Sequence, residues 1–506
     1  MKKAFKRILS ISLVLVMVFL FMPITNVFAS SNFSDKILVG YWHNFDNGTG
    51  IIRLKDVSTK WDVINVAFGE SIGDRDTIKF SPEIGTDQEF KEDIAYLNSI
   101  GKKVVLSIGG QNGGVVLLPD ENAKKNFIDS MISLIDKYGF NGIDIDLESG
   151  INLINNDKDF KNPKTPQIVN LISAVREICD HYGPDFILSM APETAYVQGG
   201  YVAYAGNWGA YLPIIHGLRD KLTYIHVQHY NAGGNTALDG NNYTQGTADY
   251  EVAMAEMLLQ GFPVAGNADN IFPPLKQEQV VIGLPACPSA APSGGYIKPS
   301  EMKKALDYLM KGISYGGKYK LVNSNGYPAF KGLMTWSINW DAKSNYEFST
   351  NYREYFDNFK QPPVTEKPSI PTGLKGEAIS KSQINITWNL ANGATSYDLK
   401  VDGNIINNVN NPYKHINLKP GSMHSYEVRA VNSVGNSEWS KSILVQTKSE
   451  SDAEKWGGAN ILYKSGDIVS YKGVNYRCIQ THTSLVGWEP INTPTLGKNK
   501  LDIIEF

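Results

Sequence analysis

The sequence predicts an α/β fold, a (β/α)8 TIM barrel, followed by two small all-β domains. Short apolar runs alternate with longer amphipathic stretches between about residues 36 and 360. A Pro-rich segment at 361–370 ends that pattern, and beyond it short strands with a period of two residues take over. The chain of 506 residues also exceeds one core, since single cores stop growing near roughly 250 to 300 residues.

Eight apolar runs of the first block are typical of buried strands, and enough chain for a helix separates each from the next. Clear helical stretches include 121–138 and 166–182. Such alternation favours a closed parallel barrel, whose chemistry lies at the C-terminal ends of the strands. The predicted strands are Ile37–Trp42, Val63–Phe68, Lys103–Ile108, Gly142–Asp146, Phe186–Met190, Tyr224–Gln228, Val280–Leu284 and Gly332–Trp336.

Residues 1–29 have the pattern of a secretory signal peptide: a basic start, an apolar run and a small-residue cleavage site that ends at Ala29. The alternative is an uncleaved membrane anchor, but the apolar run is short for a span. We therefore expect a secreted, extracellular protein with no membrane attachment in its mature form.

Charge and cysteine content exclude several classes of protein. The leader carries four of the 48 Lys and Arg residues, so 44 remain against 51 Asp and Glu, a net charge of −7. Nucleic acid is therefore a poor candidate partner. The three cysteines provide no disulfide framework, and no His/Cys cluster has zinc-ligand spacing. We expect a monomer without cofactor or metal.

Two smaller blocks follow the Pro-rich linker. Residues 371–447 alternate as short strands, such as Ser396–Val401 and Ser425–Val431, a pattern typical of a β-sandwich. Residues 455–506 are short and rich in Trp and Tyr among turn-forming residues, which favours a binding module over an enzyme.

A row of acids at the end of the fourth strand is the strongest chemical signal. Side chains alternate along a strand, so Asp144, Asp146 and Glu148 share one face at the barrel mouth. Like charges this close raise at least one pKa, which would make the outermost, Glu148, a proton donor. The alternatives are a solvated acidic strand end and a metal site. Inward-facing acids are costly without function, and no nearby His completes a ligand set.

The segment Asn141–Glu148, NGIDIDLE, resembles the DGxDxDxE motif of family 18 glycoside hydrolases. Ser107-Ile-Gly-Gly110 on the third strand is similar to the second motif of that family. The resemblance covers the whole barrel, through Gly40-Tyr-Trp42, Asn65-Val-Ala-Phe68, Met190-Ala-Pro-Glu193, Gln228-His-Tyr-Asn231 and Met334-Thr-Trp-Ser337. It implies a bacterial-type chitinase of the hevamine-like or chitinase D-like branch.

In that family the N-acetyl oxygen of the substrate attacks the anomeric carbon, so a second enzyme carboxylate is not the nucleophile. The resemblance implies that Glu148 protonates the leaving oxygen, that Asp146 holds the acetamide, and that Asp144 shares a proton with Asp146. Tyr230 would donate to the acetamide oxygen, and Trp336 would form the floor under the sugar. The expected substrate-binding residues are Gln228, Asn231, Trp336, Met190, Tyr41 and, in the last block, Trp488.

Three departures from the family pattern leave every acid in place. Asn141 replaces a usual Asp, Leu147 replaces Trp or Tyr, and Asn231 replaces an Asp near the acetamide. The Ser107–Gly110 motif is expected to shape the backbone near the site.

The segment between Leu284 and Gly332 is about 47 residues, too short for both a barrel helix and the α+β insertion of deep-cleft chitinases. We therefore expect an open groove and internal cleavage. The candidates for flanking sugar subsites, of which about half could be packing residues, are Trp42, Tyr196, Tyr201, Trp208 and Trp340.

The two smaller blocks also resemble known modules. Trp388, Tyr397, Leu418, Tyr426 and Trp439 make the middle block similar to a fibronectin type III domain, in which we expect aromatics to be core. The last block resembles chitin-binding modules of carbohydrate-binding families 5 and 12. That match implies that Trp488 lies on chitin, with His482, Thr483, Pro490 and Pro494 around it, although Trp488 packing into the module core is the alternative. Leu496-Gly497 departs from the Leu-Trp of the family.

The resulting hypothesis is a retaining chitinase that acts on chitin and chitooligosaccharides. An endo-β-N-acetylglucosaminidase acting on glycans is the second hypothesis, and the terminal module argues against it because that substrate is soluble. An inactive chitin-binding lectin is the third, and the intact Glu148, Asp146 and Tyr230 argue against it.

Overall fold

A computed structural model describes residues 35–154, 157–360, 366–391, 393–409, 411–449, 454–458, 461–472, 474–485, 487–492 and 497–499. The predicted signal peptide, the first half of the predicted linker, Pro494 and Leu496 lie outside these residues. The chain divides into two compact units, Met1–Gln361 and Pro362–Phe506, and we describe each by itself.

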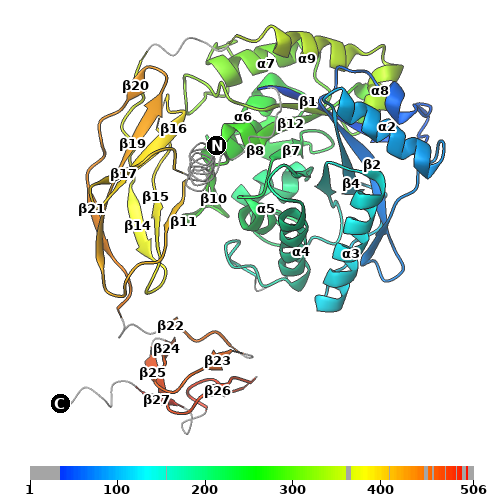
Figure 1. Ribbon diagram of the computed structural model, residues 1–506. Coiled ribbons are helices and arrows are strands. Elements are labelled where there is room, and N and C mark those ends of the chain that lie inside the picture. The colour runs from blue at the N-terminus through cyan, green and yellow to red at the C-terminus, as the bar shows by residue number, and fades with distance from the viewer. Residues whose placement is uncertain are drawn as a thin grey trace, which may run out of the picture. The chain divides into compact units, whose positions relative to one another are not determined.

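The first unit is a closed barrel of eight parallel strands, as predicted (Figure 1). Neighbouring strands follow the order β1-β13-β12-β7-β6-β5-β4-β2, and pairing of β1 with β2 closes the ring. A short strand, β3 (Thr77–Lys79), pairs antiparallel with the end of β2. The barrel strands are β1 (Ile37–His43), β2 (Val63–Ile72), β4 (Lys103–Gly109), β5 (Gly142–Asp146), β6 (Ile187–Met190), β7 (Tyr224–Gln228), β12 (Val280–Pro285) and β13 (Gly332–Trp336).

Helices surround the strands, as Figure 1 shows. The helix expected between the first two strands is absent, and the 3-10 helix η2 (Leu54–Asp56) lies there instead. Two helices that follow the last strand, α8 and α9, contact β1 and complete the ring. The described helices are α2 (Asp87–Ser99), α3 (Glu121–Tyr138), α4 (Pro166–Tyr182), α5 (Leu212–Leu218), α6 (Ala248–Gln260), α7 (Pro299–Lys311), α8 (Ile338–Lys343) and α9 (Glu347–Asp357).

Local sequence explains where these helices begin and end. The Asp120 side chain accepts from the Ala123 N–H at the start of α3, and Gly139 ends that helix in the left-handed conformation at φ 81°. Helix α2 begins with a capping box formed by Thr86 and Glu89. Pro166 begins α4, where its missing N–H costs nothing.

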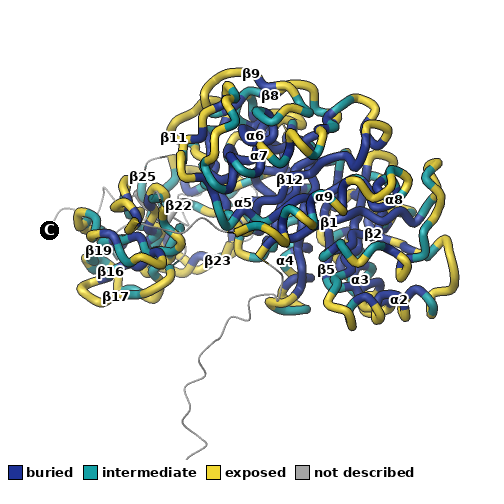
Figure 2. Tube along the Cα trace, turned by 90° about the horizontal axis from the view of Figure 1, so that it is seen from above, coloured by how far each residue is buried: buried dark blue, intermediate teal, exposed yellow. Residues whose placement is uncertain are grey.

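The barrel strands bury both faces, which appear dark blue in Figure 2. The inner face carries a cluster that includes Val39, Tyr41 and Met334. The outer face packs against the helices through a larger cluster that includes Ile143 and Ile145. Burial on both sides is what parallel strands require, and it makes the strand ends at the mouth the natural place for polar chemistry.

Hairpins and short helices fill the connections. The segment between β12 and β13 contains η6 (Pro288–Ala290) and α7, without an added sheet in this fully described stretch. The separate α+β insertion is therefore absent there, as its length predicts. The remaining elements of this unit are η3 (Thr194–Tyr196), η4 (Gln198–Tyr201), η5 (Gln277–Gln279) and the paired strands β8 (Gly234–Thr236) with β9 (Asn242–Thr244) and β10 (Phe262–Val264) with β11 (Asn267–Phe272).

The second unit begins with two antiparallel sheets that enclose one core, which contains Trp388, Leu399 and Tyr426. Trp439, expected in this core, lies outside it and is half-buried. The cationic groups of Lys400 and Arg429 lie over its ring, 4.3 and 4.6 Å from the ring centroid. The strands are β14 (Lys375–Ala378), β15 (Ile384–Thr387) and β18 (Tyr413–His415) in one sheet, and β16 (Ser396–Val401), β17 (Asn404–Ile406), β19 (Met423–Asn432), β20 (Gly435–Asn436) and β21 (Ile443–Gln446) in the other.

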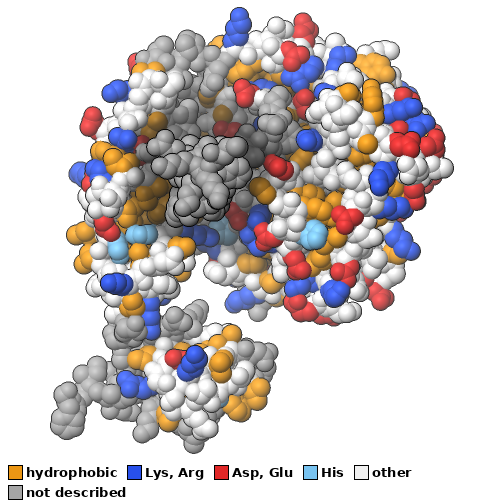
Figure 3. All heavy atoms as spheres, in the orientation of Figure 1, with side chains coloured by type: hydrophobic (Ala, Val, Ile, Leu, Met, Phe, Trp, Pro, Cys, Tyr) orange, Lys and Arg blue, Asp and Glu red, His pale blue; other side chains and the backbone are white. Residues whose placement is uncertain are grey.

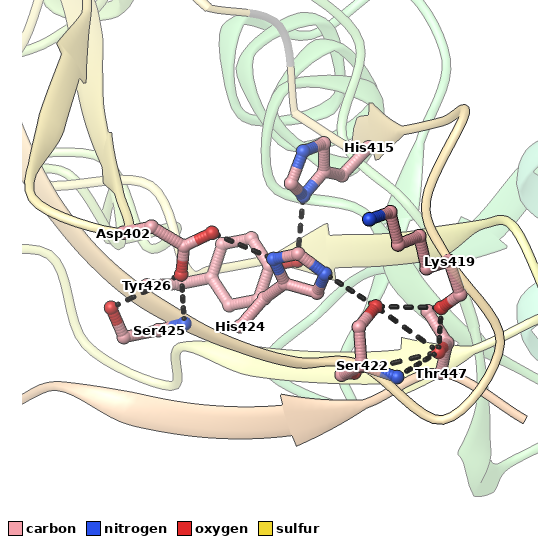
Figure 4. A network of polar contacts seen from close by, with 8 residues as sticks. All are labelled: Asp402, His415, Lys419, Ser422, His424, Ser425, Tyr426 and Thr447. Atoms are coloured by element: carbon pink, nitrogen blue, oxygen red, sulfur yellow. Dashed lines mark hydrogen bonds and ion pairs between the residues drawn. The ribbon is translucent and has the colours of Figure 1, made fainter. Parts of the chain in front are cut away.

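A polar cluster ties the turn after β16 to the start of β19 (Figure 4). Asp402 Oδ2 lies 2.6 Å from His424 Nδ1, and His424 Nε2 lies 2.8 Å from Ser422 Oγ. This is the order of groups in a serine hydrolase triad. However, the Ser422 hydroxyl also donates to the Lys419 carbonyl at 2.6 Å, and its N–H donates to Thr447 Oγ1 at 2.9 Å. Ser422 is therefore already hydrogen-bonded to the surrounding main chain and to Thr447, which indicates a structural role.

The last block has short strands around a small core of Tyr463, Val469 and Cys478, with Trp456 and Tyr476 packed against it. Its strands are β22 (Glu454–Lys455), β23 (Leu462–Tyr463), β24 (Ile468–Tyr471), β25 (Val474–Cys478), β26 (His482–Thr483) and β27 (Gly497–Asn499).

Two properties of the described part bear on partners. None of its helices is long and apolar enough to cross a membrane. Acidic and basic side chains are interspersed over the barrel face that Figure 3 shows.

Candidate active site

The three predicted acids lie in a row at the C-terminal end of β5. Asp144 is fully buried, Asp146 is 4% exposed, and Glu148 is half-buried just beyond the strand. Ile143, Ile145 and Leu147 belong to the outer core, so the acids face the barrel interior as the alternation predicts. Access to solvent therefore increases along the row toward Glu148.

Asp144 is held by four donors. The Tyr41 hydroxyl donates to it at 2.5 Å, and the hydroxyls of Ser107 and Ser189 each donate at 2.7 Å. His226 Nε2 lies 3.2 Å from its Oδ1 atom. Burial alone would raise the pKa of Asp144, but the charge of His226 and these hydrogen bonds lower it below its usual value. The lowered pKa of Asp144 favours its ionised form, whereas the resemblance implied a proton shared with Asp146.

Asp146 and Glu148 are joined through one amide. Gln228 Nε2, at the end of β7, donates to Asp146 Oδ1 at 3.0 Å and to Glu148 Oε1 at 3.0 Å. Burial raises the pKa of Asp146 well above its usual value, and the charges of Glu148 and Asp144 add to the effect. Burial also raises the pKa of Glu148, against the lowering effect of Gln228. The outer two acids therefore favour holding a proton.

Tyr230 follows two residues after Gln228 and is 7% exposed. Burial raises the pKa of its phenol, and the charges of Asp146 and Glu148 raise it further, so it remains a hydrogen-bond donor. Asn231 has a positive φ of 53°, is exposed, and accepts from the Ser293 N–H at 3.1 Å through its side chain. Of these two side chains, Tyr230 therefore lies near the outer acids.

Trp336 ends the last barrel strand and is half-buried. Its ring stacks with Phe68 at 5.9 Å between centroids and 15° between planes, and it lies 4.6 Å from the His43 ring. His43 in turn stacks with Phe45 at 4.9 Å and 7°. A cluster of aromatic rings therefore packs around Trp336 at the end of the last barrel strand.

Main-chain contacts hold the acid row in place. The Gly110 N–H donates to the Asp146 carbonyl at 2.7 Å, so the Ser107–Gly110 motif does shape the backbone beside the site. The Tyr211 hydroxyl accepts from the Leu147 N–H at 2.9 Å, and the Tyr196 hydroxyl donates to the Glu148 carbonyl at 2.8 Å.

Several expected substrate contacts need correction. Met190 is fully buried in the outer core, because the alternation along β6 turns Ser189 and Ala191 to the interior instead. Tyr41 is 1% exposed and lies under Asp144, where it holds the acid and is shielded from a substrate.

Among the five rings suggested for flanking subsites, Trp42 and Tyr196 are buried and serve packing, at 2% and 3% exposure. Trp208 is exposed, and Tyr201 and Trp340 pack partly against the core.

Ser189, His226 and Glu193 are parts of the site that were not predicted from the sequence. The period of two along β7 puts His226 on the same face as Gln228, so the signal was present. Glu193 pairs with Gln228 in an isolated bridge, and its charge raises the pKa of Glu148.

Within the described residues, no three His, Cys, Asp or Glu side chains gather closely enough to hold a metal ion.

Trp488, the expected chitin contact of the last block, is half-exposed and lies outside the small core of that block. Its ring is 5.9 Å from His482. Pro490 is buried and Thr483 is exposed nearby in the sequence.

Family models match three parts of the chain. Residues 37–362 match Glycosyl hydrolases family 18, residues 369–446 match the Fibronectin type III domain, and residues 456–498 match Carbohydrate-binding module family 5/12. Together they agree with the order of domains predicted from the sequence.

Individual relatives match the barrel. Chitinase Chi52 of Paenibacillus xylanexedens and Chitinase D of Niallia circulans are 56% and 55% identical over 324 residues. Each match covers 64% of this chain and 62% of the relative, so the chain spans less than two thirds of either protein. The crystal structure of a family GH18 chitinase from Chromobacterium violaceum has a TM-score of 0.60 and 42% identity, over 67% of this chain and 87% of that one. With its eight-stranded barrel and its row of acids, the chain belongs to the glycosyl hydrolases of family 18.

Proposed function

We propose that the protein is a secreted chitinase that hydrolyses β-1,4 linkages between N-acetylglucosamine units. The observation that carries the proposal is the single Gln228 amide that reaches both Asp146 and Glu148, each at 3.0 Å, beside the protonated phenol of Tyr230. The similarity to Chitinase Chi52 and Chitinase D supports the same activity.

The hydrogen-bond count at Gln228 supports a proton shared by the two outer acids. Its amide nitrogen lies within reach of three acceptors, because the Ala191 carbonyl is 2.9 Å away as well. An amide has only two N–H hydrogens, so two of these acceptors can be satisfied at once. A proton on Asp146 or Glu148 removes the excess of acceptors, whereas Asp144 stays ionised on its four donors.

The reaction follows from these protonation states. Glu148, with its raised pKa, donates its proton to the leaving glycosidic oxygen. The acetamide oxygen of the substrate attacks the anomeric carbon, as in substrate-assisted hydrolases, and configuration is retained. Asp146 holds the acetamide N–H and faces the developing positive charge, while Tyr230 donates to the acetamide oxygen. Glu148 then removes a proton from the attacking water.

Three further residues complete the proposed site. The flat, half-buried ring of Trp336 suits the apolar face of a pyranose. Gln228 and Asn231 supply polar contacts around the acetamide. Because the described segment between β12 and β13 carries no added sheet, we propose an open groove and internal cleavage.

The last block is proposed to bind chitin through Trp488, whose half-exposed ring lies outside the small core of the block. The sandwich is proposed to be a spacer, since the ring of its Trp439 already contacts the side chains of Lys400 and Arg429. Export by the leader at residues 1–29 and action as a monomer complete the proposal.

The deciding experiment compares wild type with Glu148→Gln on N-acetylglucosamine pentamer and on colloidal chitin. Removing the proton donor should lower kcat by at least about 100-fold, and the wild type should release short β-anomeric oligomers. Mass spectrometry and proton NMR follow product length and anomer.

Other outcomes would redirect the assignment. An inactive wild type that still binds chitin indicates a lectin, and cleavage of N-glycans alone indicates an endo-β-N-acetylglucosaminidase. Initial α-anomeric products would contradict the retaining mechanism.

A further inference from the structure

His229 stands between the two site residues Gln228 and Tyr230 at the end of β7. The alternation of side chains turns its ring away from the acids and toward α6. There its Nδ1 atom lies 2.7 Å from Glu251 Oε2, and the ring packs edge-on against Tyr250 at 5.6 Å. A helix on the outside of the barrel is thus linked to the residue between the two functional side chains.

This pair is an unusual occupant of the strand–helix core. His229 is 1% exposed and Glu251 is fully buried. Burial raises the pKa of the Glu251 carboxyl, and the nearby His229 acts in the opposite direction. A buried ionisable pair often contributes less to stability than apolar side chains of similar volume. Such a pair therefore suggests a role in specifying geometry.

Glu256, the second buried acid of α6, provides a contrast. It accepts from the hydroxyls of Tyr319 and Tyr327 at 2.8 and 2.5 Å and from the N–H groups of Val322 and Asn323 at 3.1 and 3.2 Å. All of these partners belong to the loop between α7 and β13. Glu256 therefore fixes a distant loop, whereas the partner of Glu251 adjoins the site.

Other contacts leave the main chain around His229 little freedom. The His229 N–H donates to the Gly283 carbonyl of β12 at 2.9 Å, and the Asn231 N–H donates to the Gly294 carbonyl at 2.9 Å. A Cβ atom at Gly295 would lie only 2.4 Å from Tyr230 Cα. With the ring of His229 anchored as well, this stretch is held from β12, from the Gly294–Gly295 turn and from α6.

We propose that the His229–Glu251 pair positions the end of β7, so that the Gln228 amide spans Asp146 and Glu148 and the Tyr230 hydroxyl faces them. The pair touches no substrate and acts through its two sequence neighbours. This inference rests on the proposed chitinase activity for its kinetic readouts.

The test compares Glu251→Gln with Glu256→Gln, an isosteric change of an equally buried acid on the same helix. Displacing Gln228 and Tyr230 in the Glu251 variant should lower kcat by about 10- to 100-fold with little change in KM. Because the Gln228 bond lowers the pKa of Glu148, its loss should also move the basic limb of the pH–rate profile to higher pH. Glu256→Gln should lower the unfolding midpoint and leave that limb in place.

Two further comparisons keep the proposal testable if Glu251→Gln folds poorly. His229→Asn keeps an N–H donor near the position of Nδ1, whereas His229→Leu does not, so the Asn variant should retain more activity. In a Gln228→Ala background, Glu251→Gln should cost less than it costs in the wild type, because one of the two residues through which it acts is already gone.

Three results would overturn the inference: equal losses in the Glu251 and Glu256 variants, an effect on KM alone, or an undiminished effect in the Gln228→Ala background. An inactive wild type would instead remove the proposed function. In that case the pKa of Glu148, measured by carbon NMR titration in wild type and Glu251→Gln, still tests the coupling, and an unchanged value rejects it.

Discussion

Neighbouring carboxyl groups have opposite protonation preferences in this site. Asp144 is more deeply buried than Glu148, yet its donors lower its pKa while the pKa values of Asp146 and Glu148 rise. The charge of His226 and the hydrogen bonds to Asp144 decide the difference, since burial raises the pKa in all three.

Tyr41→Phe tests this account. Removing the 2.5 Å hydrogen bond should raise the pKa of Asp144, so the acid limb of the kcat/KM profile should move to higher pH. Tyr224→Phe is the matched control, because that buried phenol in the same barrel interior bonds no carboxylate among the described residues. An acid limb that stays in place in Tyr41→Phe would argue against a role for the charge of Asp144.

His43 predicts a loss of stability in acid. Burial lowers its pKa from 6.5 to about 4, so between these values the unfolded chain binds more protons than the folded one. The free energy of unfolding should therefore fall as pH drops through this window, by up to about 3 kcal/mol. Urea unfolding at pH 7 and at pH 4.5 measures it, and His43→Phe should lose this part of the pH dependence. A variant with the same pH dependence as wild type would refute the assignment.

The acids of the site could be predicted from the sequence, but most of the residues that hold them in place could not. Alternation along β5 placed Asp144, Asp146 and Glu148 on the inner face, because inward and outward residues differ sharply in polarity there. On β6, Ser189 and Met190 are both compatible with burial, so polarity does not show which of them points into the barrel. The register with β5 shows it. The alternation along β1 turns Trp42 to the outer core, whereas Tyr196 lies in η3, where no strand period applies.

At the scale of elements, the eight barrel strands agree with the predicted runs, because buried parallel strands are continuous apolar segments bounded by turns. The identity of the helices that pack against β1 could not be predicted in this way. Its helices α8 and α9 follow the last strand, and only closure of the ring brings the two ends of the barrel together.

The contact between β4 and β5 gives a prediction at this scale. Gly109 has φ +105°, and a Cβ atom there would lie 2.3 Å from the Asp146 carbonyl oxygen. Gly109→Ala should therefore destabilise the barrel by at least about 2 kcal/mol and displace Asp146, with loss of activity. Gly139→Ala is the control, because φ is also positive there but no atom lies within 4 Å of the added methyl group. Equal activity in both variants would contradict this role of Gly109.

At the scale of the whole molecule, the order of domains was predictable because each block has its own period and composition. The roles of the small domains could not be predicted in the same way, since a tryptophan in a short β-rich block can pack or bind. Trp439 and Trp488 illustrate the two cases. Both are half-buried, but Lys400 and Arg429 lie over the first ring, whereas the second lies outside the core of its block.

Trp488→Ala should weaken binding to insoluble chitin by at least about fivefold, as expected for the loss of an aromatic contact of about 1 kcal/mol or more. Hydrolysis of soluble pentamer should be unaffected. Trp439→Ala is the matched control and should bind chitin like wild type. Sedimentation with chitin beads measures both, and equal retention of the two variants would reject Trp488 as the chitin contact.

The three thiols, at Cys179, Cys287 and Cys478, are buried and unbridged. Folding of the chain therefore requires neither a disulfide isomerase nor a particular redox potential in the compartment where it folds. Refolding should give the same yield with or without dithiothreitol, and a reducing bacterial cytoplasm should suffice for production. For an enzyme proposed to work outside the cell, folding is thus independent of the oxidising conditions in which it would act.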